Sequence, residues 1–400
     1  MHLSVVLEHR FTRTPDGAIW TQAAFGYPFW ASYLEVFDSV RVTARVTNID
    51  NAPVDYHRAD GKGVSFFPIP FYLGPLQYVA RYAQIKRVAR SAALSSEAVI
   101  LRVPSSIADH FVPVLIKTSH PYGVDVVGDP HDVFSPGAVR HPLRPWFRWW
   151  FTRRLRHQCA SACAAAYVTE KSLQRKYRPG SNTFDASFSD VELVPEAYVT
   201  IARNDFPAKG SYRLITVASL EQLYKGTDIL IEAVGRCVRE GMDLKLTIVG
   251  DGKHRTELER KVAGLGLSGR IAFKGQIPAG SAVRMEMDNA HLFALPSRTE
   301  GLPRAMMEAM ARALPCIGSM VGGIPELIPS QDMVPSGEAG ALAQKIKDIL
   351  SEPGRLATMS ERNLRVARRY SVAMMQDRRT VFLRELREMT AHWIKRVRCN

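Results

Sequence analysis

Short apolar runs alternate with stretches of helical periodicity along most of the chain. The runs span three to seven residues and are bounded by polar or turn-forming residues, which is typical of buried strands. Strands are expected at 3–7, 40–46, 64–69, 98–103, 124–127, 165–169, 213–217, 245–249, 271–273, 292–295 and 315–318. Helices are expected at 74–91, 107–117, 227–239, 255–263, 281–288 and 303–313.

Buried strands followed by crossover helices predict parallel sheets that are covered on both faces. The 400 residues exceed what one hydrophobic core ordinarily holds, so two domains are expected. Periodicity weakens over 176–209, which places the boundary near residue 197. We therefore expect an α/β protein with doubly wound domains at 1–197 and 198–375, and a helical segment, 376–400, that packs back toward the first domain. Ligands of such sheets bind at the carboxyl ends of the strands.

Composition indicates a globular protein, with 46% hydrophobic and 23% charged residues. The apolar stretches fall short of the roughly 20 residues that span a bilayer. The segment MHLSVVLEHR lacks the features of a signal peptide and is expected to form the first strand. Five scattered cysteines favour a reducing compartment over a disulfide framework. These features predict a cytoplasmic protein.

Basic and aromatic residues are concentrated in 140–157, RHPLRPWFRWWFTRRLRH. On a helix, Trp146, Trp149 and Trp150 would share one side, with arginines around them. This pattern is typical of helices that lie on anionic membranes, and it equally fits a core helix with long arginine stems. The net charge of +14 also attracts nucleic acids, but no recognised nucleic-acid module is present and no such partner is expected.

Residues 297–311, SRTEGLPRAMMEAMA, combine a loop with the start of a helix. The preceding apolar strand ends at a proline, and Pro303 suits the first helical position. The amides of this first turn form a site for an anion such as a phosphate. Glu300 falls in the loop, and Glu308 falls on the second turn beside an apolar stripe of Met307, Met310, Ala311 and Leu314. Taken alone, the two glutamates also fit a capping residue and a solvated one.

The surrounding order of motifs resembles the family 4 glycosyltransferases, which are group 1 glycosyltransferases. The resemblance includes Glu300, Gly301, Pro303, Glu308 and Ala309, followed by a turn with the sequence GGIPE at 322–326. Upstream, VASLEQLYKGTDILIEAV (217–234), LTIVGDGKHRTELE (246–259) and FKGQIP (273–278) resemble segments of the family's nucleotide domain. The resemblance is strong over 211–345 and looser over the first half of the chain.

This resemblance implies a GT-B fold, in which two Rossmann-like domains face each other across a cleft. It implies a retaining transfer of a hexose from a nucleotide-diphosphate sugar, without metal or cofactor. Glu308 would hold the ribose hydroxyls, and Glu300, with the amides of Gly301 and Leu302, would hold the sugar. Lys225 and the helix start at Pro303 would hold the diphosphate. Gly250 and Gly252 would belong to the donor site as the family's Gly-x-Gly turn.

Two candidates come from the first half of the chain. Gly17 lies after the first strand, where the family has glycines beside the donor phosphates, and it equally fits a plain surface turn. His131 is the nearest match to a family histidine that faces the transferred sugar, although the alignment needs a one-residue shift, and a simple loop histidine is the alternative.

The chain departs from the family pattern at Ser219, where an arginine usually pairs with the diphosphate. This departure keeps open an alternative function, a catalytically silent GT-B protein that binds nucleotide sugar or scaffolds an assembly. The resemblance implies a glycan or polyprenyl-linked sugar as acceptor, in cell-surface polysaccharide assembly. Together with segment 140–157, it suggests a peripheral position on the inner face of the plasma membrane.

Overall fold

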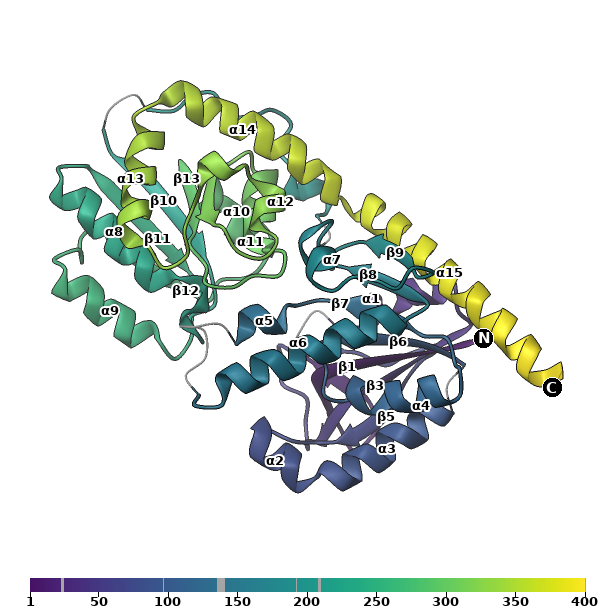
Figure 1. Cartoon of the computed structure of the whole chain (residues 1–400). Helices are drawn as coiled ribbons and strands as arrows, with labels where there is room; N and C mark the ends of the chain where they lie inside the picture. Colours follow the sequence, from purple (N-terminus) through teal and green to yellow (C-terminus); the bar gives the residue numbers. More distant parts are fainter. Residues whose placement is uncertain (23–24, 96, 135–140, 192, 208–209, 400) are drawn as a thin grey trace. The chain divides into compact units, whose positions relative to one another are not determined.

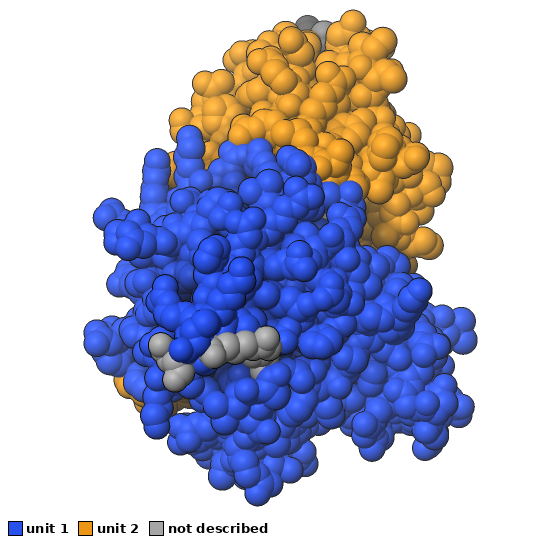
Figure 2. Space-filling model, turned by 90° about the vertical axis from the view of Figure 1, so that its right-hand side faces the viewer, with its two compact units in different colours: residues 1–128, 149–188, 376–400 blue, residues 129–148, 189–375 orange. Residues whose placement is uncertain are grey.

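The computed structural model describes residues 1–22, 25–95, 97–134, 141–191, 193–207 and 210–399. The chain divides into two compact units, coloured separately in Figure 2. Unit 1 comprises 1–128, 149–188 and 376–400, and unit 2 comprises 129–148 and 189–375. The division thus falls at 188/189 rather than near 197. Two contacts tie the intervening segment to unit 2. Leu193 forms a backbone bridge with Ser371, and the Ala197 carbonyl accepts from the Arg312 side chain, Nη1, at 3.3 Å.

Unit 1 contains a mixed, mainly parallel sheet (Figure 1). Its described strands are β1 (His2–Arg13), β2 (Ile19–Thr21), β3 (Ser39–Asn48), β4 (His57–Arg58), β5 (Val64–Pro70), β6 (Ala98–Val103), β7 (Gly123–Val126), β8 (Ala164–Tyr167) and β9 (Phe184–Ser187). The parallel part runs β5-β3-β1-β6-β7-β8-β9, and β2 and β4 add an antiparallel edge. Every residue of β6 is buried, as expected for a central strand covered on both faces.

The helices of unit 1 cover this sheet. They include α1 (Tyr27–Ala31), η1 (Ser32–Glu35), α2 (Gly74–Ala80), α3 (Tyr82–Leu94), α4 (Ala108–Lys117) and α7 (Ser172–Lys176). Two helices cross from one unit to the other, α6 (Arg144–Ser161) and α15 (Val372–Cys399). Gly123 in β7 leaves room for α15, because a Cβ there would lie 3.1 Å from a ring carbon of Phe382.

Unit 2 contains a parallel sheet in the order β12-β11-β10-β13-β14-β15, which is the order 3-2-1-4-5-6 of dinucleotide-binding folds. Figure 1 labels β10 to β13 of this sheet. Its strands are β10 (Tyr212–Val217), β11 (Leu244–Val249), β12 (Ile271–Gly275), β13 (Leu292–Leu295), β14 (Cys316–Ser319) and β15 (Met333–Val334). Strand order reverses between β10 and β13, and this switch point is where ligands of such sheets bind.

The described helices of unit 2 include the crossover connections between its strands. They are α5 (Pro130–Val133), η2 (Pro195–Ala197), η3 (Leu223–Lys225), α8 (Thr227–Arg239), α9 (Arg255–Gly264), α10 (Ser281–Asp288), α11 (Arg304–Ala311), α12 (Ile324–Leu327), η4 (Ser330–Asp332), α13 (Ala339–Leu350), α14 (Pro353–Ala367) and η5 (Arg368–Tyr370). The predicted apolar stripe of α11 is confirmed, since Met307, Met310, Ala311 and Leu314 are fully buried.

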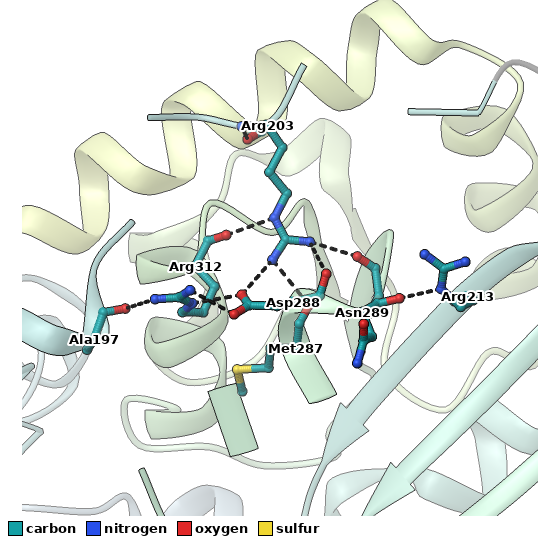
Figure 3. Close-up of polar contacts among 9 residues, drawn as sticks. Ala197, Arg203, Arg213, Met287, Asp288, Asn289 and Arg312 are labelled. Carbon is teal, nitrogen blue, oxygen red and sulfur yellow. Dashed lines mark hydrogen bonds and ion pairs between the residues drawn. The ribbon is translucent and has the colours of Figure 1, made fainter. Parts of the chain in front are cut away.

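Arg203 fixes the segment that enters unit 2 (Figure 3). Its guanidinium donates to four backbone carbonyls, among them that of Arg312 at 2.9 Å and that of Ala290 at 2.8 Å, and it also pairs with the Asp288 carboxylate. Arg312 completes the network through a two-bond pair with Asp288, at 2.8 and 2.7 Å. Five acceptors on one half-buried guanidinium hold the chain against the ends of α10 and α11.

The expected alternation of strands and helices is found, with differences at the ends of elements. The helix expected at 74–91 is two helices, α2 and α3, which meet at Arg81, where ψ is 8°. The helix expected from Pro303 begins at Arg304, with Pro303 as the residue before it. In the described part of the chain, no helix combines the length and the apolar character that crossing a bilayer requires.

Candidate functional site

The candidate site lies at the switch point of the unit 2 sheet. The loop after β10 leads through η3 into α8, and the loop after β13 leads into α11. Both loops leave the carboxyl ends of adjacent parallel strands. The sequence candidates Lys225 and Glu300 are therefore brought to one edge from positions 75 residues apart.

Lys225 and Glu300 form a close ion pair there. The Lys225 ammonium donates to both carboxylate oxygens of Glu300, at 2.7 and 2.9 Å. The hydroxyl of Ser297 donates to the same carboxylate at 2.7 Å. The Glu300 side chain is only 4% exposed, and a buried carboxylate needs such donors because burial removes its water. This pairing is not predictable from the sequence, because the two residues are 75 positions apart.

Arg298 holds the two loops together, and the sequence analysis missed it. Its guanidinium makes a two-bond pair with Asp228 of α8, both bonds at 2.8 Å, and donates to the Leu223 carbonyl at 2.6 Å. Its backbone N–H donates to the Tyr224 carbonyl at 2.6 Å. These bonds fix the loop that carries Glu300 against the loop that carries Lys225. The partner, Asp228, is 70 positions away, so only the fold reveals the pair.

The GGIPE turn supports the Glu300 loop from the other side. Gly322 has a φ of +54°, and a Cβ there would lie 1.9 Å from the Glu300 carbonyl oxygen. The N–H of Gly323 donates to the Gly301 carbonyl at 2.7 Å. Only glycine permits this conformation and this approach together, so the turn is shaped to hold residues 300–301.

Glu308 lies on α11, half-buried. Burial raises the pKa of this carboxyl above its ordinary value of 4.5, and the nearby guanidiniums of Arg304 and Arg284 oppose the shift. Gly301 and Leu302 are also half-buried and precede Pro303, after which the helix begins. The helix start and the two glutamates therefore belong to one continuous segment.

The environment of Ser219 shows which charges surround the position of the family arginine. Ser219 is exposed just after β10, and its hydroxyl accepts from the N–H of Glu221 at 3.3 Å. The Glu221 carboxylate lies 3.4 Å from the ammonium of Lys253. The sequence candidates Gly250 and Gly252 lie close to the backbone of this loop. A Cβ on Gly250 would lie 2.0 Å from a loop backbone atom, and a Cβ on Gly252 would lie 2.1 Å from another. Lys253 thus brings a cation to the loop of Ser219.

His131 is held by neighbours on its own segment and on α6. Its N–H donates to Asp129, and its Nδ1 lies 3.2 Å from Asp132 and 3.1 Å from Nη2 of Arg148. Nδ1 accepts from Arg148 in the tautomer with its proton on Nε2, and it donates to Asp132 in the other tautomer. Asp129, His131 and Asp132 have ligand atoms within 4.8 Å of one another. The Arg148 guanidinium beside the imidazole opposes a metal site there, because it would repel a metal cation.

Gly17 closes a tight turn between β1 and β2. Its N–H donates to the Thr14 carbonyl at 2.9 Å, and the N–H of Thr14 donates to the Ala18 carbonyl at 3.1 Å. Its φ of +86° is required by this hairpin. The geometry therefore accounts for Gly17 as a turn residue, which was one of the two alternatives.

Comparison with known proteins supports the group 1 glycosyltransferase superfamily. Residues 211–352 match the family described as Glycosyl transferases group 1, and they contain the whole Lys225–Glu300 site. Protein CapJ of Staphylococcus aureus is 28% identical over 312 residues, which cover 75% of this chain and 74% of CapJ. The amylovoran biosynthesis glycosyltransferase AmsK of Erwinia amylovora is 36% identical over 140 residues, 33% of this chain and 34% of that protein.

Solved structures share the fold of the whole chain. HepE of Anabaena, in complex with UDP and glucose, matches with a TM-score of 0.65 at 16% identity, over 96% of this chain and 99% of that one. The sucrose-phosphate synthase of Thermosynechococcus elongatus matches with a TM-score of 0.68 at 16% identity, over 97% and 100%. These structures are GT-B glycosyltransferases, and the predicted α/β GT-B fold with two Rossmann-like domains is confirmed.

Proposed function

We propose that the chain is a retaining glycosyltransferase that moves a hexose from a nucleotide-diphosphate sugar to a glycan or lipid-linked acceptor. The observation that carries this proposal is the Lys225–Glu300 pair. It lies at the switch point of a 3-2-1-4-5-6 sheet, in the segment that matches the group 1 family. A cation beside a buried carboxylate at that edge suits a ligand that is both a sugar and a diphosphate.

Each donor group is matched by a chemically suitable residue. Glu308 would accept the ribose hydroxyls, and Glu300, with the amides of Gly301 and Leu302, would bind the hydroxyls of the sugar. Lys225 and the first-turn amides of α11 would bind the diphosphate. An ammonium has three N–H groups, and the two Glu300 oxygens accept from two of them. The third is left for a phosphate oxygen.

The proposed transfer takes place on one face of the sugar. The bond from the anomeric carbon to the phosphate oxygen breaks, and the acceptor oxygen bonds to the same face of that carbon. The acceptor hydroxyl proton passes to the departing phosphate. Lys225 stabilises the negative charge that develops on this leaving group. His131 is proposed to face the transferred sugar, and no metal or cofactor is required.

The relatives support a role in cell-surface polysaccharide assembly. AmsK is named for amylovoran biosynthesis, and a 32% identical relative of Mycolicibacterium smegmatis, matched over 34% of this chain and 38% of that protein, is a GDP-mannose-dependent mannosyltransferase of phosphatidylinositol monomannoside. We propose a cytoplasmic enzyme peripheral to the inner face of the plasma membrane. Trp146 and Trp149 in 140–157 are 49% and 55% exposed, which supports membrane contact, and sedimentation with anionic vesicles measures it.

A catalytically silent protein that binds nucleotide sugar is the second candidate. Ser219 favours it, because a serine replaces the arginine that the family pairs with the diphosphate. Binding assays do not separate the two functions, whereas release of nucleotide does.

Donor binding is tested first with Lys225→Ala. UDP, the nucleotide bound in HepE, is the probe, and the shift in melting temperature on adding it is the measurement. Loss of a hydrogen bond to a charged group is worth about 1.5–3 kcal/mol, so we expect UDP affinity to fall about ten- to hundredfold. Lys261→Ala is the control, since it removes the lysine of a different ion pair, the partly exposed pair with Glu232. Equal UDP shifts in Lys225→Ala and Lys261→Ala would contradict the placement of the diphosphate.

A further inference from the structure

Residues of α4 and α6 in unit 1 line a groove. Figure 1 labels the two helices. Its volume of about 460 Å³ falls within the roughly 300–1,000 Å³ of small-molecule sites. Val112, Pro113 and Ile116 of α4 form an aliphatic wall, and the indole of Trp150 lines the side of α6. All lining residues belong to unit 1, so the groove is distinct from the Lys225–Glu300 site.

An ion pair between Asp109 and Arg154 lies at the inner end of the groove. Asp109 is buried and pairs with Arg154, and Gln158 Nε2 donates to its other oxygen at 2.9 Å. Burial raises the pKa of Asp109 to about 6, against the opposing effect of Arg154. The Arg154 guanidinium lies over the Trp150 ring, 4.5 Å from its centroid. These contacts fix Arg154. They also pair Asp109, which is the one carboxylate among the lining residues.

The mouth of the groove is cationic. Arg153 and His157 line it, both exposed and one helical turn apart on α6. Helix α6 has no acidic residue, and Asp109 already faces Arg154. Two guanidiniums therefore stand against one carboxylate, before any charge on His157 is counted. An anion is the ligand that this charge pattern complements.

Exposed apolar side chains flank the cationic mouth. Ile116 of the lining is 45% exposed. Trp149, outside the lining, is 55% exposed, and the Arg153 guanidinium lies 6.0 Å from its ring centroid. Indoles beside arginines are typical of surfaces that enter the headgroup layer of a membrane. A small soluble anion would leave these apolar groups in water, whereas a lipid places its glycerol and acyl chains against them.

We propose that this groove binds the phosphodiester headgroup of an anionic phospholipid at a bilayer surface. Arg153 and His157 contact the phosphate, and Trp149 and Ile116 enter the layer beside it. Asp109 holds Arg154 against Trp150 and so keeps the wall in place. The proposal rests on the peripheral membrane association given under the proposed function, and it names the surface and the lipid chemistry that would produce that association.

The test is sedimentation of the full chain with vesicles of phosphatidylcholine, with and without about one third phosphatidylglycerol, at constant salt. We expect the wild type to bind only the anionic vesicles. Affinity for them should fall about tenfold or more in Arg153→Glu and should be retained in Arg153→Lys. Trp149→Ser should weaken binding as well. Arg260→Glu makes the same charge change on the exposed face of α9, and we expect a change below about twofold in this control.

Three outcomes would overturn the proposal. Equal losses in Arg153→Glu and Arg260→Glu would show attraction by net charge alone. Release from vesicles by soluble glycerol 1-phosphate would assign the groove to a free phosphate ester. No binding of the wild type to either vesicle would remove the membrane partner itself. The UDP shift of the same variants reports separately on the sugar-nucleotide site, so failure of the groove and failure of the enzyme function are distinguishable.

Discussion

At the scale of single residues, the site depends on carboxylates that burial removes from water and that need hydrogen-bond donors in its place. Glu300 obtains its donors within the protein, from Lys225 and Ser297. Glu308 is half-buried with arginines as its nearest cations, and burial raises the pKa of its carboxyl. Ribose hydroxyls would supply the donors that Glu308 needs to remain ionised. The two carboxylates therefore differ in how their desolvation is compensated, and that difference is testable.

Glu308→Gln should move stability and nucleotide affinity in opposite directions. The pKa of Glu308 is raised above 4.5 in the folded state. The stability that the protonated carboxyl contributes is therefore fully present below pH 4.5, and it is lost as the pH rises through the raised pKa. The variant should therefore be the more stable protein at neutral pH, with the difference shrinking toward pH 4.5. UDP affinity of the wild type should rise with pH above 4.5 as the carboxylate forms, and fall about tenfold in the variant at neutral pH.

Thermal melts and UDP titrations over this pH range make the measurement. Glu257→Gln, on the exposed face of α9, is the matched control. A wild type whose UDP affinity does not change between acid and neutral pH would contradict the assignment of Glu308 to the ribose.

Sequence reasoning at this scale named individual residues but missed how they pair. It singled out Lys225, Glu300 and Glu308 because their motifs stand in a recognisable order. It missed Arg298 because a two-bond pair with Asp228 depends on two loops meeting at one edge of the sheet. It also assigned Lys225 to the diphosphate alone, since the distance from its ammonium to Glu300 exists only after folding.

At the scale of elements, turns decide the position of the site more than helices do. The GGIPE turn bonds to the loop of Glu300, and the Arg298 pair joins that loop to α8. Apolar periodicity predicted the central strands and the buried stripe of α11, because burial repeats at a fixed spacing. The break at Arg81 and the late start of α11 were not predicted, since the ends of helices depend on local backbone geometry rather than on periodicity.

Gly322→Ala tests the role of this turn. The residue would adopt a positive φ that disfavours side chains, and its Cβ would overlap the Glu300 carbonyl oxygen, so the loop must move. We expect a loss of about 3 kcal/mol in the free energy of unfolding, together with weakened UDP binding. Gly266→Ala also has a positive φ, of +72°, but nothing lies within 4 Å of its Cβ. This control should lose about 1 kcal/mol and keep its UDP affinity.

Denaturant unfolding and UDP titration measure both effects. If Gly322→Ala loses no more stability than Gly266→Ala and binds UDP normally, the turn does not hold the donor loop.

At the scale of the whole molecule, the two units carry different chemistry. Unit 2 holds the Lys225–Glu300 site, and unit 1 holds the α4–α6 groove. The fold class was predictable, because alternating strands and helices leave few arrangements for a parallel sheet. The assignment of 129–148 and 189–197 to unit 2 was not predictable, because those segments carry no strong periodicity and take their place from contacts. The groove was likewise invisible in the sequence, since Asp109 and Arg154 meet only across two packed helices.

The central claim, that this chain transfers sugar, is tested most directly by release of nucleotide. The wild type and Glu300→Gln are incubated with nucleotide sugars that include UDP-glucose, with and without an acceptor lipid extract, and free nucleotide is measured. We predict acceptor-dependent release by the wild type and a loss of about 10²–10³-fold in the variant, comparable to the removal of one stabilising group from a transition state. Equal inactivity of both proteins, with UDP still bound, would contradict the claim and favour a silent nucleotide-sugar-binding protein.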